Sequence, residues 1–223
     1  MSEFDADTDR YYAGEFDALQ DDEERLARVV DLPPLDELKV ATVQTNRTAK
    51  TGGRSTGNDG YLTPDNFLAV LSQMGPIELD PCGDERSHIW PDRDYRLDKG
   101  EDGLLESWQV ADGALVFCNP PYSQARQWIE KADLEWEVWR SNIYLLIAAR
   151  TGTIALQQTN ASMACFWRGR LTFVDPATGQ PPKDRHGRPV GAMFDSMVLG
   201  YTDDEARFRK VFAPHGRVVK WTP

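Results

Sequence analysis

The sequence ALVFCNPPYS, residues 114–123, joins an apolar run of strand formers directly to an asparagine, two prolines and a tyrosine. Proline cannot donate a backbone hydrogen bond, and it biases the residue before it toward an extended conformation. A strand cannot continue in a sheet through two prolines, whereas proline suits the first turn of a helix. The segment therefore predicts a buried strand, a fixed turn at residues 119–122, and a helix capped by Ser123. A simpler interpretation is that the tetrapeptide does no more than end the strand.

The rest of the chain alternates between short apolar runs and segments in which apolar residues recur at helical spacing. This alternation predicts an α/β sandwich with a mostly parallel sheet. Two late runs flank a long polar loop and would add an antiparallel element near the C-terminus. Thr63 would be the N-cap of the first helix, with Pro64 at its first position. Strands are expected at 77–79, 114–118, 142–148, 164–174, 192–201 and 215–221, with a possible short strand at 94–98. Helices are expected at 63–75, 123–140 and 151–159, and a loop that enters a short helix at 101–108.

Length and composition favour one folded domain with appendages, because 223 residues with 40% hydrophobic content can bury one substantial core. No run of about eighteen apolar residues occurs, and the acidic start MSEFDADTDR is unlike a signal peptide. We therefore expect a protein of the cytoplasm, with no membrane association and no obligate protein partner. Cys82, Cys118 and Cys165 are widely spaced, which predicts reduced thiols and no metal site.

Most of the negative charge lies at the N-terminus. The net charge is −11, and residues 1–39 contain thirteen Asp or Glu against four Lys or Arg, which leaves −2 for residues 40–223. We expect residues 1–44 to be an acidic tail that could hold one short helix, 45–60 a flexible linker, and 61–223 the folded domain. The tail would be solvated, or alternatively it would bind a partner or regulate the domain.

The chemistry of residues 119–122 suits a planar, conjugated amine. The lone pair of such an amine is delocalised, so the nitrogen attacks a methyl donor weakly. The side-chain oxygen of Asn119 and the backbone carbonyl of Pro120 can accept hydrogen bonds from its two N–H groups and favour a tetrahedral nitrogen. Pro121 helps to fix that backbone, and Tyr122 can stack on a base. In this respect the segment resembles the amino-methyltransferases that use S-adenosylmethionine, whose signature is Asn, Asp or Ser followed by two prolines and an aromatic residue.

Two further loops are expected at the same sheet edge, because ligands of open parallel sheets bind beyond the carboxyl ends of the strands. The loop DPCG, residues 80–83, follows the strand at 77–79, and the loop DGL, residues 102–104, precedes the strand at 114–118. Their carboxylates can accept hydrogen bonds from the ammonium, hydroxyl and amine groups of the cofactor. Each loop alone would also fit an ordinary turn.

The order of motifs between residues 61 and 200 resembles the phage-type DNA N-6-adenine methyltransferases, the Dam-like family of small phage and prophage enzymes. The motifs are TPxxF, LDPCG, DGL, W, NPPYS, ARTxT and FxxGRLxF, from Thr63 to Phe173. The resemblance implies a Rossmann-like methyltransferase fold, S-adenosylmethionine as cofactor and DNA as partner, in the host cytoplasm and in a phage or restriction–modification setting. It implies cofactor contacts at Thr63, Pro64, Asp80, Pro81, Cys82, Gly83, Asp102, Gly103 and Leu104, and catalytic contacts at Asn119, Pro120, Pro121 and Tyr122.

The cofactor loop departs from the broader methyltransferase pattern, which carries two or more glycines after the acidic residue. Here Gly83 is followed by Asp84 and Glu85, so the second glycine is missing. The carboxylate that would hold the ribose hydroxyls of the cofactor stays open between Asp94 and Asp98.

Access to a base is a further requirement, because a base in duplex DNA must leave the stack before its amine can react, and this needs contacts to phosphates. Residues 175–191, between the two late strands, gather basic side chains among turn formers and could supply such contacts. A merely solvated loop fits the sequence equally well. The candidate DNA contacts are Arg126, Arg168, Arg170, Lys183, Arg185 and Arg188.

The sequence thus predicts S-adenosylmethionine-dependent methylation of the exocyclic amino group of adenine in DNA. One alternative is a methyltransferase that acts on adenine in RNA or on a protein glutamine amide, because enzymes of these kinds also use the tetrapeptide. Another is a catalytically silent nucleic-acid binder or decoy in which the acidic tail is the working part. Cofactor binding separates the decoy from the enzymes.

Overall fold

The computed structural model of the protein describes residues 60–221. The predicted acidic tail, its short helix and all of the predicted linker except Gly60 lie outside the described residues. No helix among residues 60–221 has the length and apolar character needed to cross a membrane.

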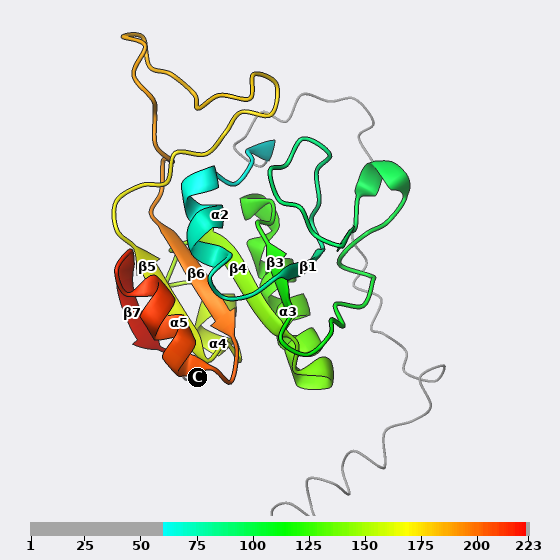
Figure 1. The fold of residues 1–223 in the computed structure, drawn as a ribbon. Coiled ribbons are helices and arrows are strands. Elements are labelled where there is room, and N and C mark those ends of the chain that lie inside the picture. Colours follow the sequence, from blue (N-terminus) through cyan, green and yellow to red (C-terminus); the bar gives the residue numbers. More distant parts are fainter. Residues whose placement is uncertain (1–59, 222–223) are drawn as a thin grey trace, which may run out of the picture. The chain divides into compact units, whose positions relative to one another are not determined.

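The described residues form a seven-stranded sheet (Figure 1). The strands are β1 (Ile77–Asp80), β2 (Arg93–Asp94), β3 (Leu115–Cys118), β4 (Asn142–Ala148), β5 (Met163–Trp167), β6 (Ser196–Tyr201) and β7 (Gly216–Lys220). Their order in the sheet is β2-β1-β3-β4-β6-β5-β7. The pairings from β2 to β4 are parallel and those from β4 to β7 are antiparallel. The predicted α/β fold with an antiparallel element toward the C-terminus is confirmed, but the sheet is not mostly parallel, because three of its six strand pairings are antiparallel.

Helices cover both faces of the sheet (Figure 1). Alternate residues of β3 face opposite ways, as a strand requires. Leu115 and Phe117 join the apolar cluster that contains α2 (Asp65–Leu71) and α5 (Glu205–Phe212). Val116 and Cys118 join the cluster that contains α3 (Ala125–Trp139) and α4 (Ile154–Gln158). Both faces of the central strands are therefore buried. The described residues also form the short 3₁₀ turns η2 (Leu97–Lys99) and η3 (Tyr122–Gln124).

Several element boundaries differ from the sequence prediction. The strand expected at 164–174 ends at Trp167, and Gly169 has a left-handed backbone (φ 76°) that turns the chain out of the sheet. The strand expected at 192–201 begins only at Ser196, because its partner β4 ends at Ala148. The segment 101–108 forms turns instead of a helix, the strand expected at 94–98 is the two-residue β2, and α5 was not predicted.

The predicted start of the first helix is also wrong in detail. Pro64, with φ −76° and ψ 147°, occupies the N-cap position of α2, and Thr63 makes no capping hydrogen bond. Ser123 is likewise not the N-cap of α3, where Gln124 stands in that position.

The parallel strands bring the carboxyl ends of β1, β3 and β4 to one edge of the sheet. Loops that follow these strands therefore gather there. The long connection between β5 and β6, residues 168–195, projects beyond the same edge (Figure 1, yellow to orange). This edge is where the predicted site residues should be sought.

Candidate active site

Asn119 and the residues after it leave the carboxyl end of β3 and enter η3 and α3. Nδ2 of Asn119 donates a hydrogen bond of 3.3 Å to the backbone carbonyl of Tyr61, just before α2. A carbonyl oxygen only accepts, so this bond turns the NH₂ group of the amide toward Tyr61 and leaves Oδ1 as the acceptor on the other side. Pro120 is buried and Pro121 is half-buried. The strand ends at Cys118 as predicted, and the 3₁₀ turn η3 begins at Tyr122.

A cavity of about 160 Å³ opens beside this turn. One wall comes from the end of β3 and the other from the connection between β5 and β6. Most of the lining is apolar or aromatic, and Asn119 places an amide in it, which suits a flat, partly polar ligand. The lining residues are Tyr61, Asn119, Pro120, Tyr122, Phe173, Pro182, Val190, Gly191, Ala192, Met193 and Phe194.

Tyr122 is held between two aromatic side chains in this cavity. Its ring meets Phe194 edge to face at 4.8 Å between centroids and Phe173 at 6.1 Å. Its hydroxyl oxygen is buried and has no hydrogen-bond partner among residues 60–221. Burial raises the pKa of Tyr122 above its ordinary value, so the phenol is neutral at physiological pH. Tyr122 would therefore contact a ligand through its aromatic ring and not through a phenolate charge.

Asp80 ends β1 at the same edge, and its side chain is only 3% exposed. Burial raises the pKa of Asp80 to about 7, although Oδ1 accepts a hydrogen bond of 3.0 Å from the N–H of Cys82. The neighbouring carboxyl groups of Asp94 and Asp84 raise the pKa further. A cationic ligand would stabilise the charged form of this buried carboxyl group and so lower its pKa.

The loop at 102–104 lies directly against the loop at 80–83. A Cβ atom on Gly103 would overlap the carbonyl oxygen of Pro81, so only glycine permits this approach. Nε1 of the buried Trp108 donates to the carbonyl of Gly103 at 2.7 Å, and the N–H of Leu104 bonds to Oδ1 of Asp102 at 3.1 Å. Both predicted cofactor loops are thus brought together and fixed.

Cys118 connects these loops to the turn at 119–122. It is the last residue of β3, and burial raises the pKa of its thiol, with a hydrogen bond to the Cys82 thiol as the next cause. Cys82 is half-buried, so the two thiols share one environment between β1 and β3. The structure therefore places all three predicted loops at one edge of the sheet.

Thr63 and Pro64 are both buried where the chain enters α2. The hydroxyl oxygen of Thr63 has no hydrogen-bond partner among the described residues, which is costly for a buried polar atom. Two backbone hydrogen bonds between Leu62 and Val174, of 2.8 and 3.0 Å, hold this segment to the connection that follows β5. A ligand with a polar group here would satisfy the hydroxyl.

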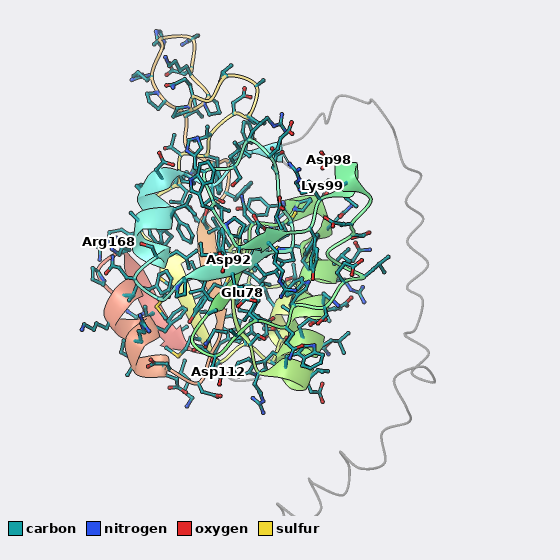
Figure 2. All side chains as sticks on the ribbon, turned by 45° about the vertical axis from the view of Figure 1, so that its right-hand side comes forward. Glu78, Asp92, Asp98, Lys99, Asp112 and Arg168 are labelled. Atoms are coloured by element: carbon teal, nitrogen blue, oxygen red, sulfur yellow. The ribbon has the colours of Figure 1, made fainter. Side chains whose placement is uncertain are left out.

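Asp94 and Asp98, the two candidates for the carboxylate that would hold the ribose hydroxyls, lie in different surroundings. Asp94 ends β2 and touches the loop at 80–83, because a Cβ on Gly83 would meet its carboxyl group at 2.9 Å. Asp98 is 67% exposed and lies in η2, beside Lys99 and far from Asp112 in the view of Figure 2. Arg96 pairs with both, at 3.3 Å to Asp94 and 3.8 Å to Asp98.

The basic candidates are not gathered into one cluster. Arg126 opens α3 and pairs with Glu130 at 2.7 Å, and Arg170 lies 3.9 Å from Asp195. Arg168 is exposed after β5, on the opposite flank of the molecule from Asp98 (Figure 2). In the chain, Arg168 and Arg170 are two residues apart, and the three in the loop at 175–191 form a second group.

Asp184 organises the tip of that loop. It accepts backbone hydrogen bonds from Arg188 and His186 at 2.9 and 2.8 Å, and these bonds, that of Arg188 first, lower the pKa of Asp184. The guanidinium of Arg188 also pairs with it at 3.0 Å. Lys183 and Arg185 are exposed and form no ion pair among residues 60–221. They are the cations of this loop that remain for an anionic partner.

Two parts of the cavity are not predicted from the sequence. The first is Tyr61, whose bond to Asn119 uses a backbone carbonyl that no side-chain pattern reveals. The second is the wall at residues 192–194, for which the apolar run Ala-Met-Phe predicts a strand. The aspartate that follows, Asp195, was the available signal that the strand starts later.

The part of the chain that the structure describes holds no group of three or more His, Cys, Asp or Glu arranged to bind a metal ion. No curated protein shows significant similarity to the chain. The sequence profile of DNA N-6-adenine-methyltransferase (Dam) matches residues 50–197, about two thirds of the chain, and spans all three loops and the cavity wall. The chain belongs to the DNA N-6-adenine-methyltransferase (Dam) family.

Proposed function

We propose that the protein transfers a methyl group from S-adenosylmethionine to the exocyclic amino group of adenine in DNA. Family membership implies a DNA adenine methyltransferase. The observation that carries the finer proposal is the cavity bounded by Asn119, Pro120 and Tyr122, which opens at the same sheet edge as the buried carboxyl group of Asp80. A pocket that fits a base and a buried carboxyl group that a cation would stabilise are expected at one edge of the sheet when a base and a cationic methyl donor meet there.

The residues present fit the cofactor. Its ammonium group would stabilise the charged form of Asp80, whose pKa burial raises to about 7. A polar group of the cofactor would satisfy the buried hydroxyl of Thr63, which has no partner among residues 60–221. When bound, S-adenosylmethionine supplies an electrophilic methyl group. The residues proposed to hold it are Thr63, Pro64, Asp80, Pro81, Cys82, Gly83, Asp102, Gly103 and Leu104.

Asp94 is the better candidate for the ribose hydroxyls. It ends the strand next to β1 and lies against the loop at 80–83, whereas Asp98 is 67% exposed and more remote from that loop in the chain. Ion pairs with Arg96 and Lys99, at 3.3 and 3.5 Å, hold the Asp94 carboxylate in place. A fixed carboxylate can accept from two adjacent hydroxyl groups at little further cost.

The turn after β3 would activate the amine. Oδ1 of Asn119 and the carbonyl of Pro120 accept hydrogen bonds from the two N–H groups of the base, which draws the lone pair of the nitrogen out of the ring system. The ring of Tyr122 stacks on the base, and Phe194 holds that ring from the side. Transfer would be direct, with no covalent enzyme intermediate: the carbon–nitrogen bond would form as the carbon–sulfur bond of the donor breaks, S-adenosylhomocysteine would be the leaving group, and one proton of the amine would pass to solvent.

The DNA duplex would be held at the edge from which the connection between β5 and β6 projects. Lys183 and Arg185 are the strongest candidates for phosphate contacts, because Arg188 is already paired with Asp184. Arg126, Arg168 and Arg170 are further candidates at the same edge.

The proposal is tested by incubating the purified full chain with radiolabelled methyl donor and with duplex DNA, RNA or protein. Digestion of each product and mass spectrometry of the nucleosides then identify the methylated atom. We expect N6-methyladenine from DNA alone. Methylation of RNA or of glutamine instead would replace the substrate, and the absence of both cofactor binding and methyl transfer to any of them would favour the silent binder.

A further inference from the structure

An exposed methionine stands at the rim of the cavity. Met193 lines the cavity, yet it is 80% exposed. Its two neighbours are anchored: the N–H of Ala192 donates to the carbonyl of Leu171 at 2.8 Å, and Phe194 packs on Tyr122 at 4.8 Å. Both neighbours pack against the core on the side of α2 and α5. The anchored neighbours therefore fix the backbone position of Met193, while its apolar side chain faces solvent.

The position of this side chain suits a contact that forms only when DNA is bound. An exposed methionine contributes nothing to the free protein by burial, since its apolar surface stays in water. Val190, on the same rim, is also exposed, at 41%. Arg170 flanks the rim, because a Cβ on the adjacent Gly191 would lie 3.0 Å from its Cβ. An apolar side chain beside a cation fits a position where a protein meets stacked bases next to a phosphate backbone.

We propose that Met193 enters the DNA base stack at the place that the target adenine leaves when it turns into the cavity. The proposal rests on the proposed function, because it requires an adenine that leaves the duplex. An unbranched, flexible side chain can fill the gap and keep contact with the neighbouring base pairs, which lowers the cost of unstacking. Met193 is a positioning residue: it acts on the population of the extrahelical state and does not touch the reacting amine.

The test compares Met193→Ala with the conservative control Met193→Leu, which keeps most of the apolar volume. Two duplexes carry the target sequence once it is known from sequencing, one with the adenine paired to thymine and one with it opposite a mismatched base. A mismatched base costs least to turn out. We expect Met193→Ala to lower kcat/KM about tenfold or more on the paired duplex but less than about threefold on the mismatched one. Met193→Leu should restore most of the loss.

A second measurement follows the extrahelical state itself. With 2-aminopurine at the target position, binding of the wild-type chain should raise the fluorescence, and Met193→Ala should reduce that rise at saturating protein. Equal activity of Met193→Ala and wild type on the paired duplex, or an equal loss on both duplexes, would overturn the proposal. Because the comparison uses a wild-type chain that methylates both duplexes, its failure differs from failure of the proposed function, in which the wild type methylates neither.

Discussion

Nδ2 of Asn119 donates a hydrogen bond of 3.3 Å to the carbonyl oxygen of Tyr61, and this bond joins the end of β3 to the entry of α2 across 58 residues of sequence. The bond fixes which end of the amide faces the cavity. An acceptor, Oδ1, is thereby available to an amine, while one of the two N–H donors of the amide is already used. The arrangement favours a substrate N–H as the partner of Oδ1.

Cofactor binding should depend on pH through Asp80. Its pKa of about 7 in the free protein means that below pH 7 the carboxyl group holds a proton, and a cationic cofactor must displace that proton to gain the ion pair. Affinity for S-adenosylmethionine should therefore rise with pH between 5.5 and 7, by about tenfold per unit well below the pKa. Calorimetric titrations in buffers of different ionisation enthalpy should detect release of one proton per cofactor at pH 6.

Asp80→Asn is the control for this prediction. Asparagine keeps the size and one acceptor oxygen but cannot ionise, so the affinity should be weak and flat across the same pH range. An unchanged pH dependence in Asp80→Asn would assign the titration to another group.

Gly103→Ala should destabilise the site. The added methyl group would overlap the carbonyl oxygen of Pro81, and the two cofactor loops would have to separate. Overpacking of this kind costs about 1–3 kcal/mol, and we expect that loss in denaturant unfolding together with weaker cofactor binding. Gly152→Ala is the matched control, since no atom lies within 4 Å of the added carbon. Equal stability of the two variants would contradict the close approach of the loops.

Tyr122→Ala and Tyr122→Phe should behave differently. Loss of the ring removes the surface on which the base stacks, and base binding should weaken by about 1–3 kcal/mol. Tyr122→Phe should be mild, because the hydroxyl is buried without a partner among residues 60–221. The measurement is affinity for a duplex with a mismatched target adenine. An equal loss of affinity in Tyr122→Ala and Tyr122→Phe would show that the hydroxyl contacts the substrate.

Lys183 and Arg185 should contribute to the salt dependence of DNA binding. Each phosphate contact releases counterions, so the slope of log K against log salt should fall by about 0.9 for each lost contact. Lys183→Ala and Arg185→Ala should each flatten the slope by this amount. Lys220→Ala is the control, because Lys220 lies at the opposite edge of the sheet and pairs with Glu205 at 2.8 Å. A slope that does not change in Lys183→Ala would remove this lysine from the DNA contact surface.

The sequence was sufficient to locate the loops but not to describe their chemistry. The turns after Asp80 and Cys118 were predicted because each follows an apolar strand, and parallel pairing then brings both to one edge. The missed helix α5 does carry a signal: Phe208, Val211 and Phe212 recur at helical spacing after the N-cap Asp204, which accepts from the N–H of Arg207 at 2.9 Å.

Other features depend on contacts that no local pattern contains. The burial of Asp80, and therefore its raised pKa, arises from packing between segments distant in sequence. The apolar residues 192–194 have strand propensity, yet β4 ends at Ala148 and leaves them no partner. They form the cavity wall instead. Local propensity is a weak guide where a neighbouring strand decides the outcome.

The central claim is that Asn119 activates an adenine amine in DNA. Removal of one preorganised polar group from an active site typically costs ~10²–10³ in rate, whereas cofactor affinity should stay close to that of the wild type, because Asn119 faces the base. Asn119→Asp is a useful companion, since a carboxylate cannot donate to the Tyr61 carbonyl and should lose the orientation of the acceptor.

The most direct measurement is sequencing that detects N6-methyladenine in the DNA of cells that express either the wild-type chain or Asn119→Ala at equal levels. We predict methylated adenines at a defined sequence with the wild type, and at least about a hundredfold lower methylation rate with Asn119→Ala. Absence of methylated adenine with the wild type, or the same methylation in both, would contradict the account.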